Sequence, residues 1–169
     1  MSARPAAVDF RCRLEQPPCE RMFEFAAFAF PLGGAFVAGW PTAPGAVRHD
    51  VAGRPVLLHF APARWLAPAP QADVTALLEM AIRAGAGAVV DVAGKWQVLE
   101  LLGPGATRLL ASTVDVEAVL ERRECAAVTL FDCPAVLARL PDGFVVWVKA
   151  SYAADFVAAV ERLRSRRGD

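Results

Sequence analysis

The sequence predicts an α+β domain, and two observations carry this prediction. Short runs rich in β-branched and aromatic residues are separated by turns of Gly, Pro and Asp, a pattern typical of strands. Two longer stretches, 74–84 and the one that begins at Ser151, instead repeat apolar residues at helical spacing. Several strands follow one another as a meander without a helix between them, so no βαβ unit is expected.

The stretch from Ala86 to Val116 is the unit around which the chain is organised. Val89, Val90 and Val92 favour a strand, and a turn at 93–94 leads into a second strand over 95–102. On that second strand the alternation places Trp96, Val98 and Glu100 on one face. A Gly-Pro-Gly corner at 103–105 then begins a short helix, whose inward residues are Ala106, Leu109 and Leu110.

The last third predicts three strands and a closing helix. The strands cover 125–131, 135–140 and 144–148, with a tight corner at 132–134 and a hairpin turn at 141–143. The helix is capped by Ser151, and its buried face comprises Tyr152, Phe156, Val160 and Leu163. The charged stretch 117–124 is expected to be a solvent-facing end.

The first half predicts a less regular version of the same series. Residues 1–20 are expected to be a flexible N-terminal arm that ends at Pro17-Pro18. A β-hairpin over 22–40, turning at 31–34, is favoured over a membrane span because Glu24, Pro31 and two glycines interrupt its apolar run. A loop, a strand over 54–60, an extended piece at 64–66 and a helix over 74–84 complete this half.

The bulk composition excludes several classes of protein. Hydrophobic residues make up 56% and charged residues 21% of the chain, so disorder is not expected, and the net charge of +0 gives no electrostatic footprint for nucleic acid. The N-terminus lacks the apolar core of a signal peptide. The four cysteines show no metal-binding spacing. Reduced thiols, a cytoplasmic location, no metal and no membrane or nucleic-acid partner are therefore expected.

The segment DVAGKWQVLELLGPGATRLLASTVDV carries a resemblance to known families. Its matching residues are Asp91-Val92, Gly103-Pro104, Ala106, Leu109-Leu110 and Asp115-Val116. It resembles the segment shared by the glycine-cleavage T-protein family, the folate-binding YgfZ-like proteins and the gamma subunit of heterotetrameric sarcosine oxidase. The resemblance implies an α+β, duplicated T-protein-like folate-binding domain over 21–165. Its repeats would cover about 21–85, degenerate, and about 86–165, and would exchange strands. Each would roughly run two strands, a helix, three strands and a helix.

The chain departs from the catalytic members of this group in one informative place. T-proteins carry a glycine pair and an aspartate pair downstream of the shared core, whereas residues 127–140 here read AVTLFDCPAVLARL. The cysteine signature of the YgfZ-like proteins is also absent. The ending DGFVVWVKASYAADFVAAV resembles that of the gamma subunit. The resemblance therefore implies a non-catalytic, gamma-like subunit of a sarcosine oxidase type complex in one-carbon metabolism. Its larger flavoprotein subunits would bind the cofactors.

A stand-alone tetrahydrofolate-binding protein of the T-protein/YgfZ type is the alternative. It would use a central cleft with Trp65, Trp96 and Arg108 nearby. The Gly-Pro-Gly corner does not match a dinucleotide fingerprint. Asp91 and Asp115 fit structural caps better than acid/base catalysis, and Cys133 fits an inert thiol, so no catalytic residue is predicted.

Tryptophans and arginines supply the candidate contacts to a partner, because both are enriched at interface hot spots. Trp96 and Trp147 lie within predicted strands and are expected in the core. Trp40 and Trp65 adjoin Pro/Gly-rich loops and are expected to be less buried, where they could also stack on a pterin. The candidate contacts are Trp40, Arg64, Trp65 and Arg139. The partner would be a larger flavoprotein subunit or a second copy of the chain.

Overall fold

The computed structural model describes residues 12–18, 21–28, 40–68 and 72–165. The strands are β1 (Arg13–Glu15), β2 (Met22–Ala27), β3 (Val47–His49), β4 (Pro55–Ala61), β5 (Arg64–Pro68), β6 (Gly87–Asp91), β7 (Trp96–Leu102), β8 (Cys125–Leu130), β9 (Cys133–Leu140) and β10 (Gly143–Lys149). The helices are α1 (Ala72–Arg83), α2 (Ala106–Leu110), α3 (Val116–Leu120), the 3₁₀ turn η2 (Ala150–Tyr152) and α4 (Ala153–Ser165). The predicted α+β class is confirmed.

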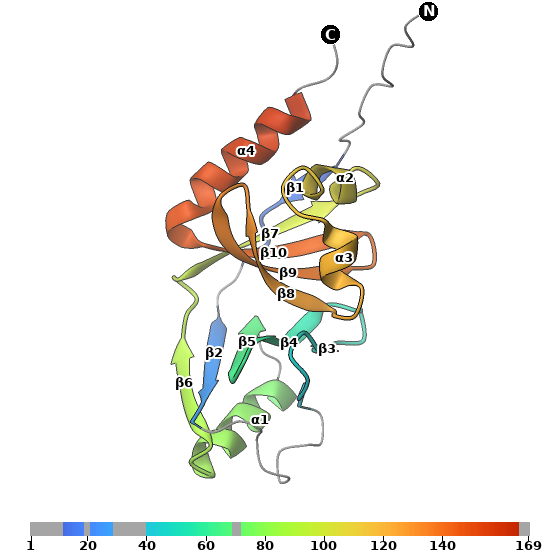
Figure 1. Ribbon diagram of the computed structural model, residues 1–169. Coiled ribbons are helices and arrows are strands. Elements are labelled where there is room, and N and C mark those ends of the chain that lie inside the picture. Colours follow the sequence, from blue (N-terminus) through green and yellow to red (C-terminus); the bar gives the residue numbers. More distant parts are fainter. Residues whose placement is uncertain (1–11, 19–20, 29–39, 69–71, 166–169) are drawn as a thin grey trace, which may run out of the picture.

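The strands form two antiparallel five-stranded sheets. Sheet A has the order β8-β9-β10-β7-β1, and sheet B has the order β3-β4-β5-β2-β6. Each sheet therefore holds four strands from one half of the chain and takes its last strand from the other half. As Figure 1 shows, β6 lies beside β2 at one edge of sheet B.

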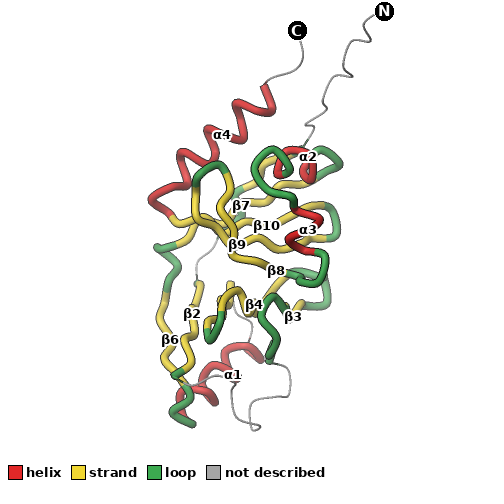
Figure 2. Tube along the Cα trace, in the orientation of Figure 1, coloured by secondary structure: helices red, strands yellow, loops and turns green. Residues whose placement is uncertain are grey.

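The two sheets face each other, and helices cover their outer faces. Figures 1 and 2 show α1 beyond sheet B, with α2, α3 and α4 around sheet A. Three apolar clusters fill the resulting layers. One packs sheet A against α2, α3 and α4, and another packs sheet B against α1. The third lies between the sheets and includes Met22, Leu58, Leu66, Trp96, Val98, Val145 and Trp147.

The predicted alternation along β7 is confirmed. Trp96 and Val98 belong to the layer between the sheets, whereas Leu99 and Leu101 belong to the cluster under the helices of sheet A. Glu100, which shares the face of Val98, is also buried, with 5% of its surface exposed. The strand thus presents a carboxylate to an otherwise apolar layer.

Several expectations from the sequence are wrong in detail. The flexible arm does not extend to residue 20, because Arg13–Glu15 pairs with Leu102–Glu100 at the edge of sheet A. The charged stretch 117–124 is mostly exposed, as predicted, but part of it packs against the core. It contains most of α3, which Asp115 caps by accepting a hydrogen bond from the Ala118 N–H and which buries Val116 and Leu120. Tyr152 precedes α4 in a 3₁₀ turn and is exposed.

Part of the predicted first-half hairpin is outside the described residues. Its first strand is β2, but the turn predicted at 31–34 and most of the return strand are not described. The predicted strand over 54–60, the extended piece and the helix match β4, β5 and α1, but the predicted loop before them contains β3, which pairs with β4. No helix among the described ranges is long and apolar enough to cross a membrane.

Candidate functional site

Among the described residues, the two buried glutamates, Glu24 and Glu100, occupy corresponding positions in the two sheets. Ala26 pairs with Arg64 where the β4–β5 turn ends, and Leu102 pairs with Gly143 where the β9–β10 turn ends. Each glutamate lies two residues before that position on its strand, and each is 5% exposed. A buried carboxylate needs a charged or hydrogen-bonding partner, so the groups around each one define the polar sites of this fold.

Glu100 is paired with an arginine from the opposite sheet. Arg54, directly before β4, reaches across and forms an ion pair with the Glu100 carboxylate. The Asp50 Oδ1 atom accepts a hydrogen bond from the Arg54 backbone N–H at 2.9 Å and fixes the start of β4. The ion pair therefore joins sheet B to sheet A.

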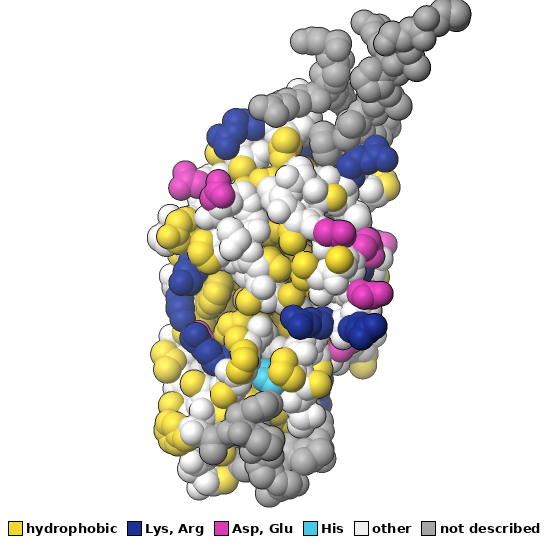
Figure 3. Space-filling model, in the orientation of Figure 1, with side chains coloured by type: hydrophobic (Ala, Val, Ile, Leu, Met, Phe, Trp, Pro, Cys, Tyr) yellow, Lys and Arg dark blue, Asp and Glu magenta, His cyan; other side chains and the backbone are white. Residues whose placement is uncertain are grey.

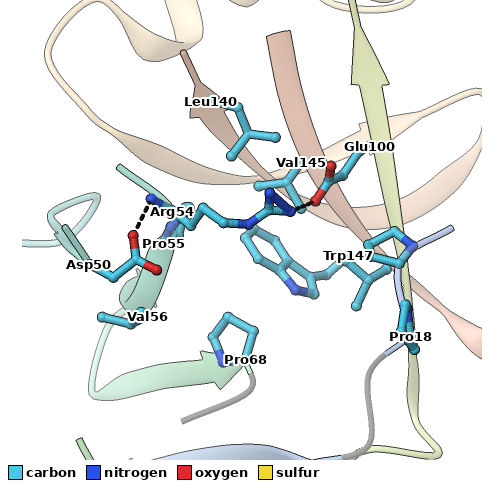
Figure 4. Close-up of a pocket in the computed structure, with 12 residues that line it drawn as sticks. Pro18, Asp50, Arg54, Pro55, Val56, Pro68, Glu100, Leu140, Val145 and Trp147 are labelled. Carbon is cyan, nitrogen blue, oxygen red and sulfur yellow. Dashed lines mark hydrogen bonds and ion pairs between the residues drawn. The ribbon is translucent and has the colours of Figure 1, made fainter. Parts of the chain in front are cut away.

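A cavity of about 250 Å³ surrounds this ion pair. Its walls are mainly apolar, with Val56 and Pro68 on sheet B and Val98 and Val145 on sheet A. Trp147 lies in the middle of the close-up in Figure 4, next to the Arg54–Glu100 pair. Its indole N–H is buried and has no hydrogen-bond partner among the described residues. An acceptor atom of a small ligand would satisfy this donor.

Glu24 is paired with two cations. Arg64 at the start of β5 forms an ion pair with one carboxylate oxygen, and the Lys95 Nζ atom lies 2.8 Å from the other. Burial, and then repulsion from Arg64, lower the pKa of Lys95. The side chains of Arg64 and Lys95 are 49% and 43% exposed, respectively. This cluster has one positive charge more than the Glu24 carboxylate can balance.

The Glu24 cluster lies at an open groove of about 630 Å³. The groove floor includes Ala26, Val90 and Val92, and Arg64 and Lys95 lie at its border. Figure 3 shows basic side chains beside hydrophobic ones on the side of the molecule where Figure 1 places β2 and β6. The groove combines an apolar floor, the edge strand of sheet B and the two cations that share Glu24, and Asp91 also lines it.

His59 is buried on β4 and lies outside both sites. Its ring stacks on Trp65 with centroids 4.2 Å apart and an angle of 21° between the planes. Burial lowers the pKa of His59, although backbone groups of residues 41–43 and Ala61 act in the opposite direction. The histidine is therefore neutral when folded at neutral pH.

We expect this buried histidine to make the protein less stable in acid. In the unfolded chain His59 binds a proton as pH falls below about 6.5, whereas the folded state resists protonation, so stability is lost below that pH. Urea unfolding at about pH 8 and about pH 5 measures this loss. His59→Phe, which keeps a ring against Trp65, should reduce the pH dependence, and the surface variant His49→Gln should keep it. An unchanged pH dependence in His59→Phe would contradict the assignment.

The predicted cleft residues Trp65, Trp96 and Arg108 do not form one site. Trp65 packs against α1 on the outer face of sheet B, and Trp96 lies between the sheets. Arg108 is exposed on α2, which covers the outer face of sheet A. The structure therefore gives no common cleft to these three side chains.

The expectation that Trp40 and Trp65 are less buried is wrong. Trp65 is fully buried and donates a hydrogen bond from Nε1 to the Pro41 carbonyl at 2.8 Å. Trp40 is 5% exposed and contacts Trp65 edge to face. Neither ring can reach a partner or form an exposed stacking platform in this conformation. The other two candidate contacts, Arg64 and Arg139, are about half-exposed and pair with Glu24 and Glu117.

The thiols of Cys125 and Cys133 have no feature of a reactive cysteine. Burial, followed by repulsion from Asp155 and Asp132, raises the pKa of Cys133. Burial raises the pKa of Cys125 to about 12. A thiol with a raised pKa is a poor nucleophile. Within the described ranges, no three His, Cys, Asp or Glu residues come together as a metal site.

A two-residue turn joins β8 to β9. Phe131 and Asp132 both have positive φ, 50° and 63°, as a type I′ hairpin turn requires. The sequence placed this corner one residue later, at 132–134. The turn is too short to carry the glycine and aspartate pairs of the T-proteins.

Comparison with known proteins finds a match in structure. No protein-family model matches this chain, and no curated protein sequence matches it. The fold is similar to a chain in the structure "Heterotetrameric Sarcosine Oxidase from Corynebacterium sp. U-96 in complex with pyrrole 2-carboxylate". The TM-score is 0.76 and the identity 22%, over 94% of this chain and 86% of that chain. The two chains share a fold.

Sequence reasoning missed the residues that build the two polar sites. Glu24, Arg54, Lys95 and Glu100 were not among the predicted site residues. A signal was present, because Glu24 and Glu100 each interrupt an apolar strand, in MFEFAA and WQVLELL. An acidic residue on the buried face of a strand indicates a charged partner across the interface.

Proposed function

We propose that this protein is a non-catalytic subunit of a heteromeric complex of the sarcosine oxidase type. The exposed face of β2 and β6 that includes Ala26, Ala88 and Val90, with Phe28 directly after β2, carries the proposal, and we call it the β2–β6 face. Phe28 is 74% exposed and Val90 is 57% exposed, and Val90 lines the same groove as the cations Arg64 and Lys95. Exposed apolar residues beside charged ones favour a surface that a partner covers. The fold shared with the sarcosine oxidase chain suggests the class of complex.

The partner in this proposal is a larger flavoprotein subunit, and this chain would support assembly in one-carbon metabolism. The proposed location is the cytoplasm, because Cys12, Cys125 and Cys133 are free thiols. The matching strand orders of the two sheets support a duplicated domain whose halves exchange β1 and β6. In that interpretation the first repeat begins at β1 and not at residue 21.

Affinity purification of the tagged protein from its own cells tests the subunit role. We expect recovery of a larger polypeptide in near-equal amount, with the visible absorption of a flavin. The surface variant Val51→Ala, far from any packed contact at 110% exposure, should recover the same polypeptide. A colourless protein that is recovered alone would contradict the proposal.

Tetrahydrofolate binding by a stand-alone protein is a second candidate, and the Trp147 cavity favours it. A pterin ring offers acceptor atoms to the free indole N–H of Trp147. The cavity of about 250 Å³ is below the usual range of about 300–1,000 Å³ for ligand pockets, so it would hold only part of a folate. Titration followed by tryptophan fluorescence should saturate and should weaken in Trp147→Phe. A flat titration would reject this candidate.

A further inference from the structure

The edge strand β6 has one side without a described strand neighbour. Of the described strands, β2 alone pairs with β6. The Val92 N–H bonds the Met22 carbonyl at 2.7 Å, and the Phe28 N–H bonds the Ala86 carbonyl at 2.9 Å. Hydrogen-bonded pairs alternate along an antiparallel ladder. Val90 and Ala88 therefore bond toward β2, and the backbone groups of Gly87, Val89 and Asp91 point away from it.

Such an edge binds extended chains by adding a strand. Main-chain hydrogen bonds supply affinity, and side chains next to the edge supply specificity. Here the neighbouring side chains are those of the β2–β6 face. Ala26, Ala88 and Val90 are exposed on it, so a partner strand with apolar residues on this face would bury them.

The charged side chains at the border of the groove favour a partner segment of negative charge. Arg64 and Lys95 share one carboxylate, Glu24, and both keep exposed donor groups. The nearby carboxylate of Asp91 accepts the Ala93 N–H at 3.0 Å in its own turn. A carboxylate from a partner would pair with the exposed donor groups of Arg64 and Lys95, whereas a lysine would add a third cation beside them.

We propose that β6 accepts an extended acidic segment of a partner subunit as a sixth strand of sheet B. This inference rests on the proposed function as far as the natural partner is concerned. It also predicts which kind of peptide the isolated chain binds. The edge of β6 that faces away from β2 should bind a strand of alternating apolar and acidic residues more tightly than a strand of alternating apolar and basic residues.

Two short synthetic peptides test the preference on the full chain. One alternates valine with glutamate, and the other alternates valine with lysine. The acidic peptide should bind more tightly, by up to about fivefold for each charge pair, and should slow amide exchange at Val89 and Asp91. Lys95→Glu should reverse the order of the two affinities. Arg83→Glu, on α1 with a 79% exposed side chain, is the matched control and should leave the order unchanged.

Several results would overturn the inference. The inference fails if the two peptides bind with equal affinity, if neither peptide binds, or if amide exchange slows only outside β6. Protection of Val89 and Asp91 in the protein alone, rising with its concentration, would make a second copy the occupant. Failure of the subunit role can be told apart from failure of this inference, because the peptide measurements need no natural partner. If the partner is recovered equally well by Lys95→Glu, this inference fails and the subunit role stands.

Discussion

Replacing Trp65 with alanine is expected to lower the free energy of unfolding by about 3–5 kcal/mol, the usual effect of removing a large buried aromatic side chain. Trp65 has no exposed surface and contacts Phe25, Trp40 and His59 through its ring. Its loss would leave a cavity between sheet B and α1 and would free the Pro41 carbonyl. Urea or thermal unfolding measures the change.

Two further variants separate the contributions of Trp65. Trp65→Phe keeps much of the ring and loses the hydrogen bond to Pro41, so a smaller loss of about 1–3 kcal/mol is expected. Val51→Ala should change stability by less than about 0.5 kcal/mol, because the residue is exposed. A Trp65→Ala protein as stable as Val51→Ala would show that Trp65 is not a core residue.

Replacing Gly87 with alanine is expected to disrupt the pairing of β2 with β6. A Cβ atom at residue 87 would lie 2.3 Å from the Ala26 carbonyl oxygen and 2.5 Å from the Phe25 ring. One of these neighbours is backbone and the other is a buried ring, so β6 must move. We expect a loss of about 1–3 kcal/mol and faster amide exchange along β6. Unfolding and hydrogen exchange measure the two effects.

Gly94 supplies the matched control for this substitution. A Cβ atom there would meet nothing within 4 Å, so Gly94→Ala should change stability by less than about 0.5 kcal/mol. Equal stability of the two variants would contradict the close approach of β2 and β6. Because β6 is an edge strand of sheet B among the described strands, Gly87→Ala should also weaken capture of the partner.

Local patterns in the sequence were sufficient for most elements in the second half of the chain. The alternation in WQVLELL predicted which residues of β7 face the other sheet, because side chains of a strand point to opposite faces in turn. The turn residues at 141–143 predicted the β9–β10 hairpin in the same way. These signals are local, so one sequence is enough to find them.

The errors concern long-range contacts. Arg13–Glu15 carries no strong strand signal, and pairing with β7 alone makes it a strand. Trp40 and Trp65 adjoin loops in sequence, yet α1 and sheet B enclose them together. The partnership of Arg54 with Glu100, 46 residues apart, likewise depends on how the two sheets face each other. Neighbouring residues can indicate that such a contact exists, as Glu100 does within an apolar strand, but they do not identify the distant residue that makes it.

The subunit role is best tested by the native mass of the tagged protein recovered from its own cells. Wild-type protein and Lys95→Glu would be purified in parallel at low salt, because screening weakens exposed charge contacts. We expect the wild type in a complex with a larger polypeptide and Lys95→Glu mainly alone. A wild-type chain with the mass of a single copy, 18.1 kDa, would show that this protein is not a stable subunit of such a complex.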